Sequence, residues 1–435
     1  MLSLKTKISK ISLSLLMALS LNATETYTVD DLILQALQNS PDLQISSGRF
    51  EASQSRTDIA SSSYLPTLDL HLSAGENGMS DIPTNPDDMV SDTLILGSLS
   101  LKQIIYDFGK TGDNVDSFKY ESESFSMSNS QEISNKKRDV KLAYYNVLQA
   151  LALIEVQKEN VKLNEIQLYR SQKYFDAGIR TKIDISDAQV ELIKSKLDLK
   201  TAQYDLKLAY ASLDQTVGFK GYTNDYRVYS EELDLQNLYS SLSNYPLNLH
   251  SSVEFAYENR YELKKYMADL KSVEAQNSLA KSEYYPSLYI GADYTKQNVD
   301  KFKSSIPEDK WQASVNLDWN LYKGGSTLAA AQEQKINVSI SSSELQNMKL
   351  SIKKATTEAY INVDKTKDAV ELSQSLVEVS NEKFDQAGKR YEHGLSDYIE
   401  LQQSRQGYID AKASLVVNYY SHYQAIAYLD NAIGK

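Results

Sequence analysis

The residue types that perform most covalent and metal chemistry in proteins are scarce in this chain of 435 residues. Cysteine is absent, which excludes disulfide bonds, thiolate nucleophiles and thiolate metal ligands. The four histidines (His71, His250, His393 and His422) are scattered, so we do not expect a histidine-based metal cluster. We find neither a phosphate-cradling glycine loop nor a nucleophile–base constellation. We therefore predict no catalysis, no metal site and no cofactor.

The charge balance and the N-terminus narrow the class of protein. The 46 basic and 58 acidic residues give a net charge of −12, which disfavours nucleic acid as a partner. Near the start, Lys5, Lys7 and Lys10 precede an apolar run that extends from Ile11 to Leu21. This pattern predicts a secretory signal peptide over residues 1–23. A membrane-anchoring helix is the alternative, although the run is too short to span a bilayer.

The rest of the chain contains the same pattern twice. Ala36–Asn39 matches Ala256–Asn259 at an offset of 220 residues (256 minus 36). After the proline pair Pro66 and Pro286, the offset becomes 216 (322 minus 106) for Tyr106–Gly109 against Tyr322–Gly325. The same offset relates two further glycine pairs, namely Gly178 with Gly394 and Gly218 with Gly434. We infer two structural repeats, residues 24–218 and 251–435, joined by an equatorial linker over 219–250.

Each repeat contains one very long helical segment. Gly109 and Gly178 are 69 residues apart, as are Gly325 and Gly394, and neither interval contains proline. We expect long helices over 109–177 and 325–393, each followed by a return helix, over 179–217 and 395–433. Apolar residues recur every seven positions, which is typical of a coiled coil. They are Ile133, Val140, Val147, Ile154, Val161, Leu168 and Phe175, and then Val363, Val370, Val377, Phe384 and Tyr391.

Shorter helical segments would together form a second rod in each repeat, a composite strut beside the long helix. Asn39 to Pro66 spans 27 residues and Gly178 to Gly218 spans 40, so together they give 67, close to the 69 of the long helix. The second half has the same spacings. Each repeat would therefore supply one continuous helix and one composite helix of nearly equal length.

Between the helices, the apolar period changes from seven to two. Alternating residues within the segments 66–108 and 286–324 predict a strand pair in each repeat. The clearest apolar face consists of Trp311, Ala313, Val315, Leu317, Trp319 and Leu321, which we expect to face lipid. Loops at about 73–92 and 295–310 would then lie outside the cell. Four strands do not close a water-filled barrel, whereas twelve strands from three chains would. A soluble sandwich with one wet face is the alternative.

The order of these elements resembles the TolC-like outer-membrane efflux family. The residues that carry the resemblance are Asn39 and Asn259, Pro66 and Pro286, Tyr106-Asp107-Phe108-Gly109, Leu321-Tyr322-Lys323-Gly324-Gly325, and the tips around Gly178 and Gly394. The resemblance implies an α+β membrane protein in which a long coiled-coil α-helical barrel adjoins a transmembrane β-barrel, with four strands per protomer and twelve in the trimer. It also implies outer-membrane lipid, a periplasmic adaptor and an inner-membrane transporter as partners of a homotrimer.

The resemblance also assigns roles to residues at the ends of the long helices. The tips that would dock the adaptor are Ala177, Gly178, Ile179, His393, Gly394 and Leu395, although a plain helix-hairpin turn also explains the glycines. Glu400 falls on the acidic position that closes the periplasmic aperture, with Tyr391 and Asp184 in the closing network. Gln403 and Ser396 depart from the family, which has a second acid and an arginine there. Asp187 and Asp397 lie nearby and are candidates to substitute.

Three copies of Glu400 and Asp184 would form rings of like charge, which favour cations in a narrow opening. Carboxylates on a solvated helix face are the simpler alternative for each acid. The leading interpretation is a passive trimeric exit duct for efflux of small molecules or for type I secretion. A soluble periplasmic coiled-coil scaffold or adaptor is the second interpretation, and the cargo cannot be read from the sequence.

Overall fold

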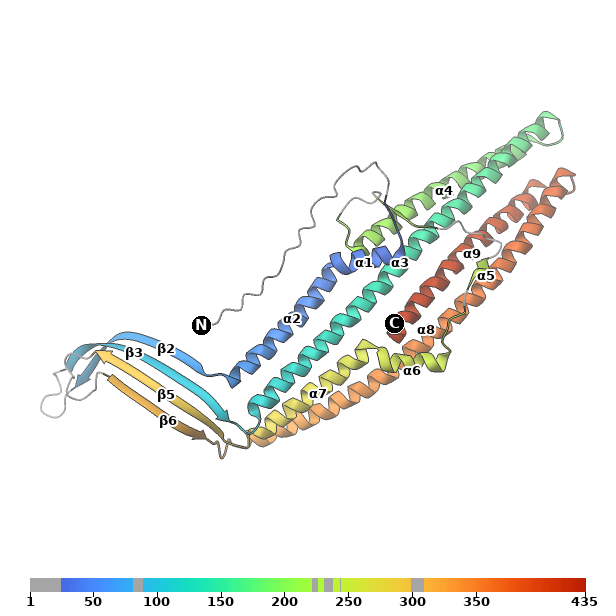
Figure 1. The fold of residues 1–435 in the computed structure, drawn as a ribbon. Coiled ribbons are helices and arrows are strands. Elements are labelled where there is room, and N and C mark those ends of the chain that lie inside the picture. Colours follow the sequence, from blue (N-terminus) through green and yellow to red (C-terminus); the bar gives the residue numbers. More distant parts are fainter. Residues whose placement is uncertain (1–24, 81–88, 221–225, 231–237, 243, 299–308) are drawn as a thin grey trace, which may run out of the picture.

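The computed structural model describes residues 25–80, 89–220, 226–230, 238–242, 244–298 and 309–435. The expected signal peptide, residues 1–23, lies outside these residues, as do parts of the expected exterior loops and of the linker. The described chain consists of an elongated array of helices with a curved four-stranded sheet at one end (Figure 1). None of the described helices combines the length and the apolar character needed to cross a membrane.

Two helices of 67 residues each extend along most of the array. They are α3 (Lys110–Asp176) and α8 (Ser326–Glu392), and at about 1.5 Å per residue each is roughly 100 Å long. Each is followed by a return helix of 36 residues, α4 (Lys182–Val217) or α9 (Tyr398–Ile433). The return helices begin three residues later than the sequence suggested. The reason is that a turn and an N-cap residue separate each glycine from the helix that follows it.

The composite strut contains a break that the sequence reading did not place. A short helix, α1 (Val29–Asn39), precedes α2 (Pro41–Ser61), and α6 (Leu249–Asn259) precedes α7 (Tyr261–Ser282). The end of α4 abuts the start of α2, since a Cβ on Gly218 would lie 3.0 Å from the carbonyl oxygen of Asn39. The end of α9 abuts the start of α7 in the same way, at Gly434 and Arg260.

The sheet is antiparallel, in the order β2-β3-β5-β6. Its strands are β2 (Thr67–Ser80), β3 (Met89–Tyr106), β5 (Ser287–Asn298) and β6 (Asp309–Asp318). The expected loops over about 73–92 and 295–310 were therefore too long. In the first of them, β2 and β3 pair as far as Ser80 and Met89. A three-residue 3-10 helix, Ser62–Tyr64, leads into β2. Within the chain, β2 and β6 each have one unpaired edge.

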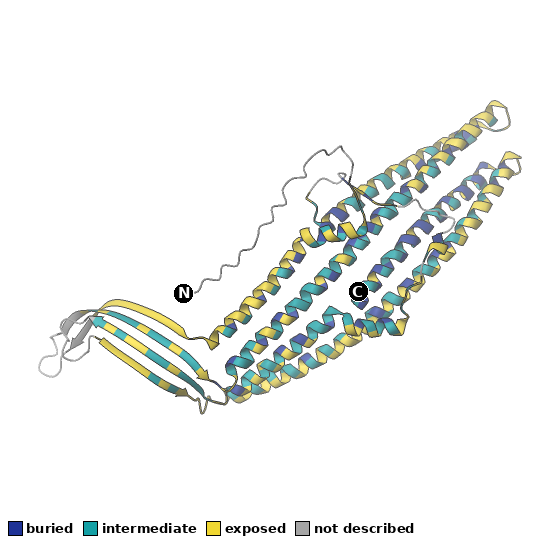
Figure 2. Ribbon diagram, viewed as in Figure 1, coloured by how far each residue is buried: buried dark blue, intermediate teal, exposed yellow. Residues whose placement is uncertain are grey.

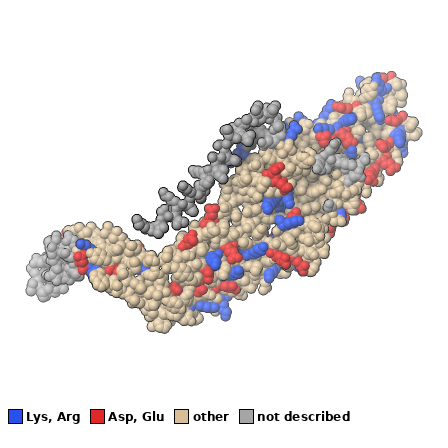
Figure 3. Space-filling model, in the orientation of Figure 1, with Lys and Arg blue, Asp and Glu red and all other residues tan. Residues whose placement is uncertain are grey.

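One face of the sheet is apolar and open. Leu70 pairs with Leu99, which pairs with Tyr294, which pairs with Trp311, so these side chains form one row across all four strands. Leu70 is 68% exposed and Trp311 is 78% exposed. The sheet is mostly exposed or half-buried in Figure 2, and Figure 3 shows few charges over its middle. Charged side chains are concentrated on the helices instead.

The linker contributes a small sheet that the sequence reading missed. β1 (Glu25–Tyr27) pairs in parallel with β4 (Tyr226–Val228), close to the middle of the long helices. The hydroxyl of Tyr226 donates to Asp214 Oδ1 on α4 at 2.7 Å. Farther along, α5 (Leu238–Ser241) lies against α8, where the backbone N–H of Tyr239 donates to Gln374 at 2.8 Å. The described part of the linker is therefore packed against the helices.

The heptad seam is apolar only in its middle part. Val140, Val147 and Ile154 are buried on α3, as are Val363 and Val370 on α8. Nearer the tip, polar residues replace the expected apolar ones at the buried positions of α3. They are Asn160, Asn164, Gln167 and Ser171. Phe175, the last residue of the expected seam, is 41% exposed. The seven-residue period alone did not reveal this change, because it tracks apolar residues rather than buried ones.

Replacement of Gly218 by alanine should destabilise the protein more than the same replacement at Gly178. Both glycines have positive φ (82° and 71°), a conformation that costs an L-residue roughly 1–2 kcal/mol. A Cβ at Gly178 meets no atom within 4 Å, whereas one at Gly218 meets the backbone at 3.0 Å. Overpacking of that kind adds roughly 1–3 kcal/mol. Thermal unfolding in detergent, followed by circular dichroism, should show the larger loss for Gly218→Ala. Equal losses would contradict the close helix junction.

A buried histidine should make the helical part less stable in mild acid. His422 on α9 is 1% exposed, and burial lowers the pKa of its ring below the usual value of about 6.5. The unfolded chain then binds a proton at a higher pH than the folded chain does, so stability falls as the pH drops below about 6.5. The melting temperature should decrease between pH 7.5 and pH 5.5, and this decrease should be smaller in His422→Gln. An identical pH dependence in both proteins would contradict this role.

Candidate functional site at the helix tips

The two hairpin tips have the same backbone turn. Gly178 and Gly394 adopt φ values of 71° and 73°, which ends the long helices in a left-handed residue. The N–H of Ile179 donates to the carbonyl of Tyr174, and the N–H of Leu395 donates to that of Arg390, both at 2.8 Å. These bonds satisfy carbonyls at the ends of α3 and α8, so the glycines have a structural role.

The predicted docking residues lie at the ends of both hairpins and are open to solvent. Ile179 is 65% exposed and Leu395 is 71% exposed. Ala177, Gly178, His393 and Gly394 are exposed beside them. Each tip therefore presents one aliphatic side chain on a turn whose backbone is held by hydrogen bonds.

Two of the predicted aperture acids cap the return helices. Asp184 and Thr181 form a capping box, in which the N–H of Thr181 donates to Asp184 Oδ2 at 3.0 Å. Asp397 is the N-cap of α9 and accepts from the N–H of Glu400 at 3.0 Å. These bonds satisfy free N–H groups at helix N-termini, where negative charge is favourable.

The remaining predicted aperture residues fall into two groups. Glu400 lies 3.4 Å from Arg390 Nε and is partly exposed, while Asp187 is exposed on α4. Tyr391 is only 2% exposed and packs with Tyr174 and Tyr398, its ring centroid 6.3 Å and 6.2 Å from theirs. Burial raises the pKa of Tyr391, and the charge of Asp184 raises it further. The structure thus brings Asp184 near Tyr391 but places Glu400 with Arg390.

Arg180 connects the two tips, a role that the sequence reading did not assign to it. Its Nη2 donates to the carbonyl oxygens of Tyr391 at 2.9 Å and Ser396 at 3.3 Å. Its guanidinium also lies 4.5 Å from the centroid of the Tyr391 ring. Ser396 is the position where the resembled family has an arginine. Here the arginine comes from the opposite tip, and its place two residues after Gly178 was the only signal for it in the sequence.

An ion pair joins the hairpins slightly farther from their ends. Arg170 on α3 lies 2.9 Å from Glu392 on α8. Both side chains are about half exposed, so this contact contributes less than one in the interior would. Within the described part of the chain, no cluster of histidine, cysteine and acidic residues has a geometry that could hold a metal ion.

Comparisons with known proteins connect this geometry to a family. The family described as outer membrane efflux protein matches residues 32–219 and 253–435, one match for each repeat. The outer membrane protein TolC of Vibrio cholerae is 21% identical over 296 residues, which cover 67% of this chain and 66% of that protein. TolC of Escherichia coli is 27% identical over 195 residues, covering 45% and 38%. The matched stretches span less than two thirds of either relative.

A solved structure shows the same fold. The Campylobacter jejuni CmeC outer membrane channel superimposes with a TM-score of 0.79 at 16% identity, over 93% of this chain and 85% of that one. The two chains therefore share their fold over most of their lengths. Because the family match covers both repeats, this chain belongs to the outer membrane efflux protein family, the TolC-like channels of the outer membrane.

Proposed function

We propose that three copies of this chain form a passive exit duct through the outer membrane, with a helical tunnel in the periplasm. The observation that carries this proposal is the sheet, whose apolar face and two free edges adjoin helices of roughly 100 Å. Channels of the TolC family form trimers. Three sheets of four strands would make twelve strands, enough to surround a water-filled channel, with β2 of one chain beside β6 of the next.

The apolar face of the sheet matches lipid better than a protein core. Trp311, Val315 and Leu317 on β6 are 60% or more exposed, and Ala313 lies on the same face. No described element covers this row, so a soluble scaffold would leave it in water. Trp319 and Leu321 follow the end of β6, where the indole N–H of Trp319 donates to the carbonyl of Tyr284 at 3.1 Å. These two residues would lie at the interface between barrel and tunnel.

The tunnel would be sealed by contacts between neighbouring chains. On α4, Ile183, Val190, Leu197 and Tyr204 recur every seven residues, and each is 48% or more exposed. A heptad row of this kind is the side of a coiled coil that lacks its partner helix. The neighbouring copy supplies that partner in the trimer.

The periplasmic end would dock a periplasmic adaptor and, through it, an energised inner-membrane transporter. Ile179 and Leu395 are exposed aliphatic residues on rigid turns, suited to small apolar contacts with such a partner. Small molecules or secreted proteins would leave through the duct, and the transporter would select them. The acids near this end, Asp184, Asp187, Asp397 and Glu400, form the constriction, and the buried Tyr391 supports them from behind.

Replacement of Glu400 by glutamine should weaken the cation preference of the channel. Three copies of this acid form a ring in the proposed trimer. Glutamine removes their negative charge while retaining the shape, and it leaves the neighbouring Arg390 without its anion. In planar bilayers, the permeability ratio of potassium to chloride should move toward one. Glu378→Gln, which removes an exposed acid on α8 away from the proposed constriction, is the matched control and should leave the ratio unchanged. If both variants behave like wild type, Glu400 does not line the constriction.

Replacement of Arg180 by glutamine should open the periplasmic end. The change removes two charge-assisted hydrogen bonds and the contact with the Tyr391 ring, the direct link between the two tips of one protomer. Hydrogen bonds to charged groups contribute roughly 1.5–3 kcal/mol, so the open population should rise about tenfold or more. Single-channel recording should show higher conductance or longer openings. Arg56→Gln, which breaks an ion pair between α2 and α3, should not. Wild-type gating in Arg180→Gln would show that the contacts of Arg180 with Tyr391 and Ser396 do not hold the periplasmic end closed.

A further inference from the structure

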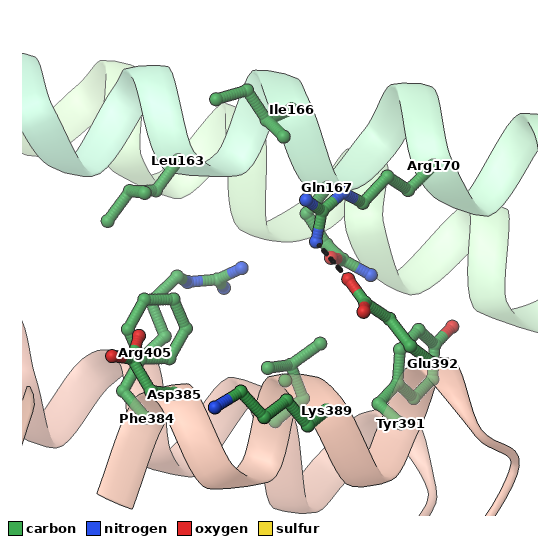
Figure 4. A pocket seen from close by; sticks show the side chains of 12 residues that line it. Leu163, Ile166, Gln167, Arg170, Phe384, Asp385, Lys389, Tyr391, Glu392 and Arg405 are labelled. Atoms are coloured by element: carbon green, nitrogen blue, oxygen red, sulfur yellow. Dashed lines mark hydrogen bonds and ion pairs between the residues drawn. The ribbon is translucent and has the colours of Figure 1, made fainter. Parts of the chain in front are cut away.

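A cavity of about 410 Å³ lies between the two hairpins, close to their tips. Its walls belong to α3, α8 and α9, so it spans both repeats (Figure 4). Leu163, Ile166, Phe384 and Leu401 supply apolar wall, and Gly388 leaves one side without a side chain. The volume is that of pockets that bind small molecules, and the lining combines this apolar wall with several polar and charged side chains.

A buried cation faces this cavity. Arg405 on α9 is only 2% exposed, and its Nε has no hydrogen-bond partner among the described residues. Figure 4 shows its guanidinium directed into the space between the hairpins. The phenol of Tyr398 lies close to it: burial raises the pKa of Tyr398 overall, with Glu191 and Asp187 adding to the rise and the charge of Arg405 opposing it. A neutral phenol does not balance the charge, Glu191 pairs with Lys194 instead, and no described carboxylate forms an ion pair with Arg405. The guanidinium therefore lacks the directly paired anion that a buried cation requires.

The other charges lining the cavity do not supply that anion. Arg170 and Glu392 neutralise each other at 2.9 Å. Lys389 and Asp385 also line the cavity, and neither makes an ion pair within the described part of the chain. Two unpaired cations therefore face one unpaired acid, which leaves the cavity positive. The planar fork of a guanidinium can donate to both oxygens of a carboxylate at once, and the apolar wall beside it suits an organic acid.

We propose that this cavity binds a small carboxylate with an apolar body, its carboxylate group on Arg405 and its body against Leu163, Ile166 and Phe384. The ligand is an aliphatic or aromatic monocarboxylic acid in its ionised form. Because the cavity walls come from α3 on one side and from α8 and α9 on the other, the bound molecule ties the two hairpins together. In the proposed duct it holds the periplasmic end in the arrangement that Arg180 also favours.

The test uses two fluorinated probes and the whole protein in a non-ionic detergent. 4-(Trifluoromethyl)benzoate carries the required charge, and 4-(trifluoromethyl)benzamide has nearly the same shape without it. Titrations followed by ¹⁹F NMR should show saturable binding of the benzoate and at least tenfold weaker binding of the benzamide. Arg405→Gln should reduce benzoate affinity about tenfold or more, while Arg138→Gln, a half-buried arginine elsewhere on α3, should not.

A second variant protects the test against misfolding of Arg405→Gln. Gly388→Leu fills the cavity without altering Arg405, because a Cβ at Gly388 meets nothing within 4 Å, and it should abolish benzoate binding in a stable protein. Benzoate binding that is absent, unsaturable, matched by the benzamide, or unchanged in Gly388→Leu would overturn the proposal. Channel conductance in the same preparation is measured separately, so failure of the carboxylate site is distinguishable from failure of the duct.

Discussion

The four-stranded sheet has two unpaired edges and one open apolar face, and the described part of a single chain covers neither. Its outer strands, β2 and β6, each present a row of unpaired backbone N–H and C=O groups, and its apolar face is open. Unpaired backbone groups cost several kcal/mol each in a lipid environment, so the edges have to pair with other strands. Closure with two further copies meets that need, and lipid covers the apolar face. The open edges of the sheet therefore favour the proposed trimer, the assembly that channels of the TolC family form.

The helices are constrained by the same closure. A tube built from several helices requires matching helix lengths in the two repeats. The long helix has 67 residues in both repeats, and the return helix has 36 residues in both. Glycine at positions 218 and 434 allows each return helix to approach the next helix closely enough to extend it. At the opposite end, the chain reverses at Gly178 and Gly394. Arg180 lies just after the first of these turns, and its side chain donates to the carbonyl of Tyr391 in the other tip.

Much of this architecture could be predicted because it depends on local patterns. Strict alternation around Val315 indicates one face of a strand, and seven-residue spacing through Val147 indicates one face of a helix. The structure confirms a strand at Val315 and a buried helix face at Val147, and the fold matches that of a solved channel. The missed features depend on residues far apart in sequence. The β1–β4 pairing joins residues 25–27 to 226–228, and Arg180 meets a tip more than 200 positions away. Periodicity contains no information about such partners. Roles for the aperture acids remain predictions, and two of these acids also have capping bonds that explain their positions.

Electron cryo-microscopy of the protein extracted from membranes in detergent tests the central claim most directly. The account predicts a trimer in which β2 of each chain pairs with β6 of its neighbour, closing a twelve-stranded barrel on a tube roughly 100 Å long. The exposed row on α4 should lie at the contact between chains. A monomer or dimer that stays in solution without detergent, with the apolar face of the sheet buried against protein, would contradict it.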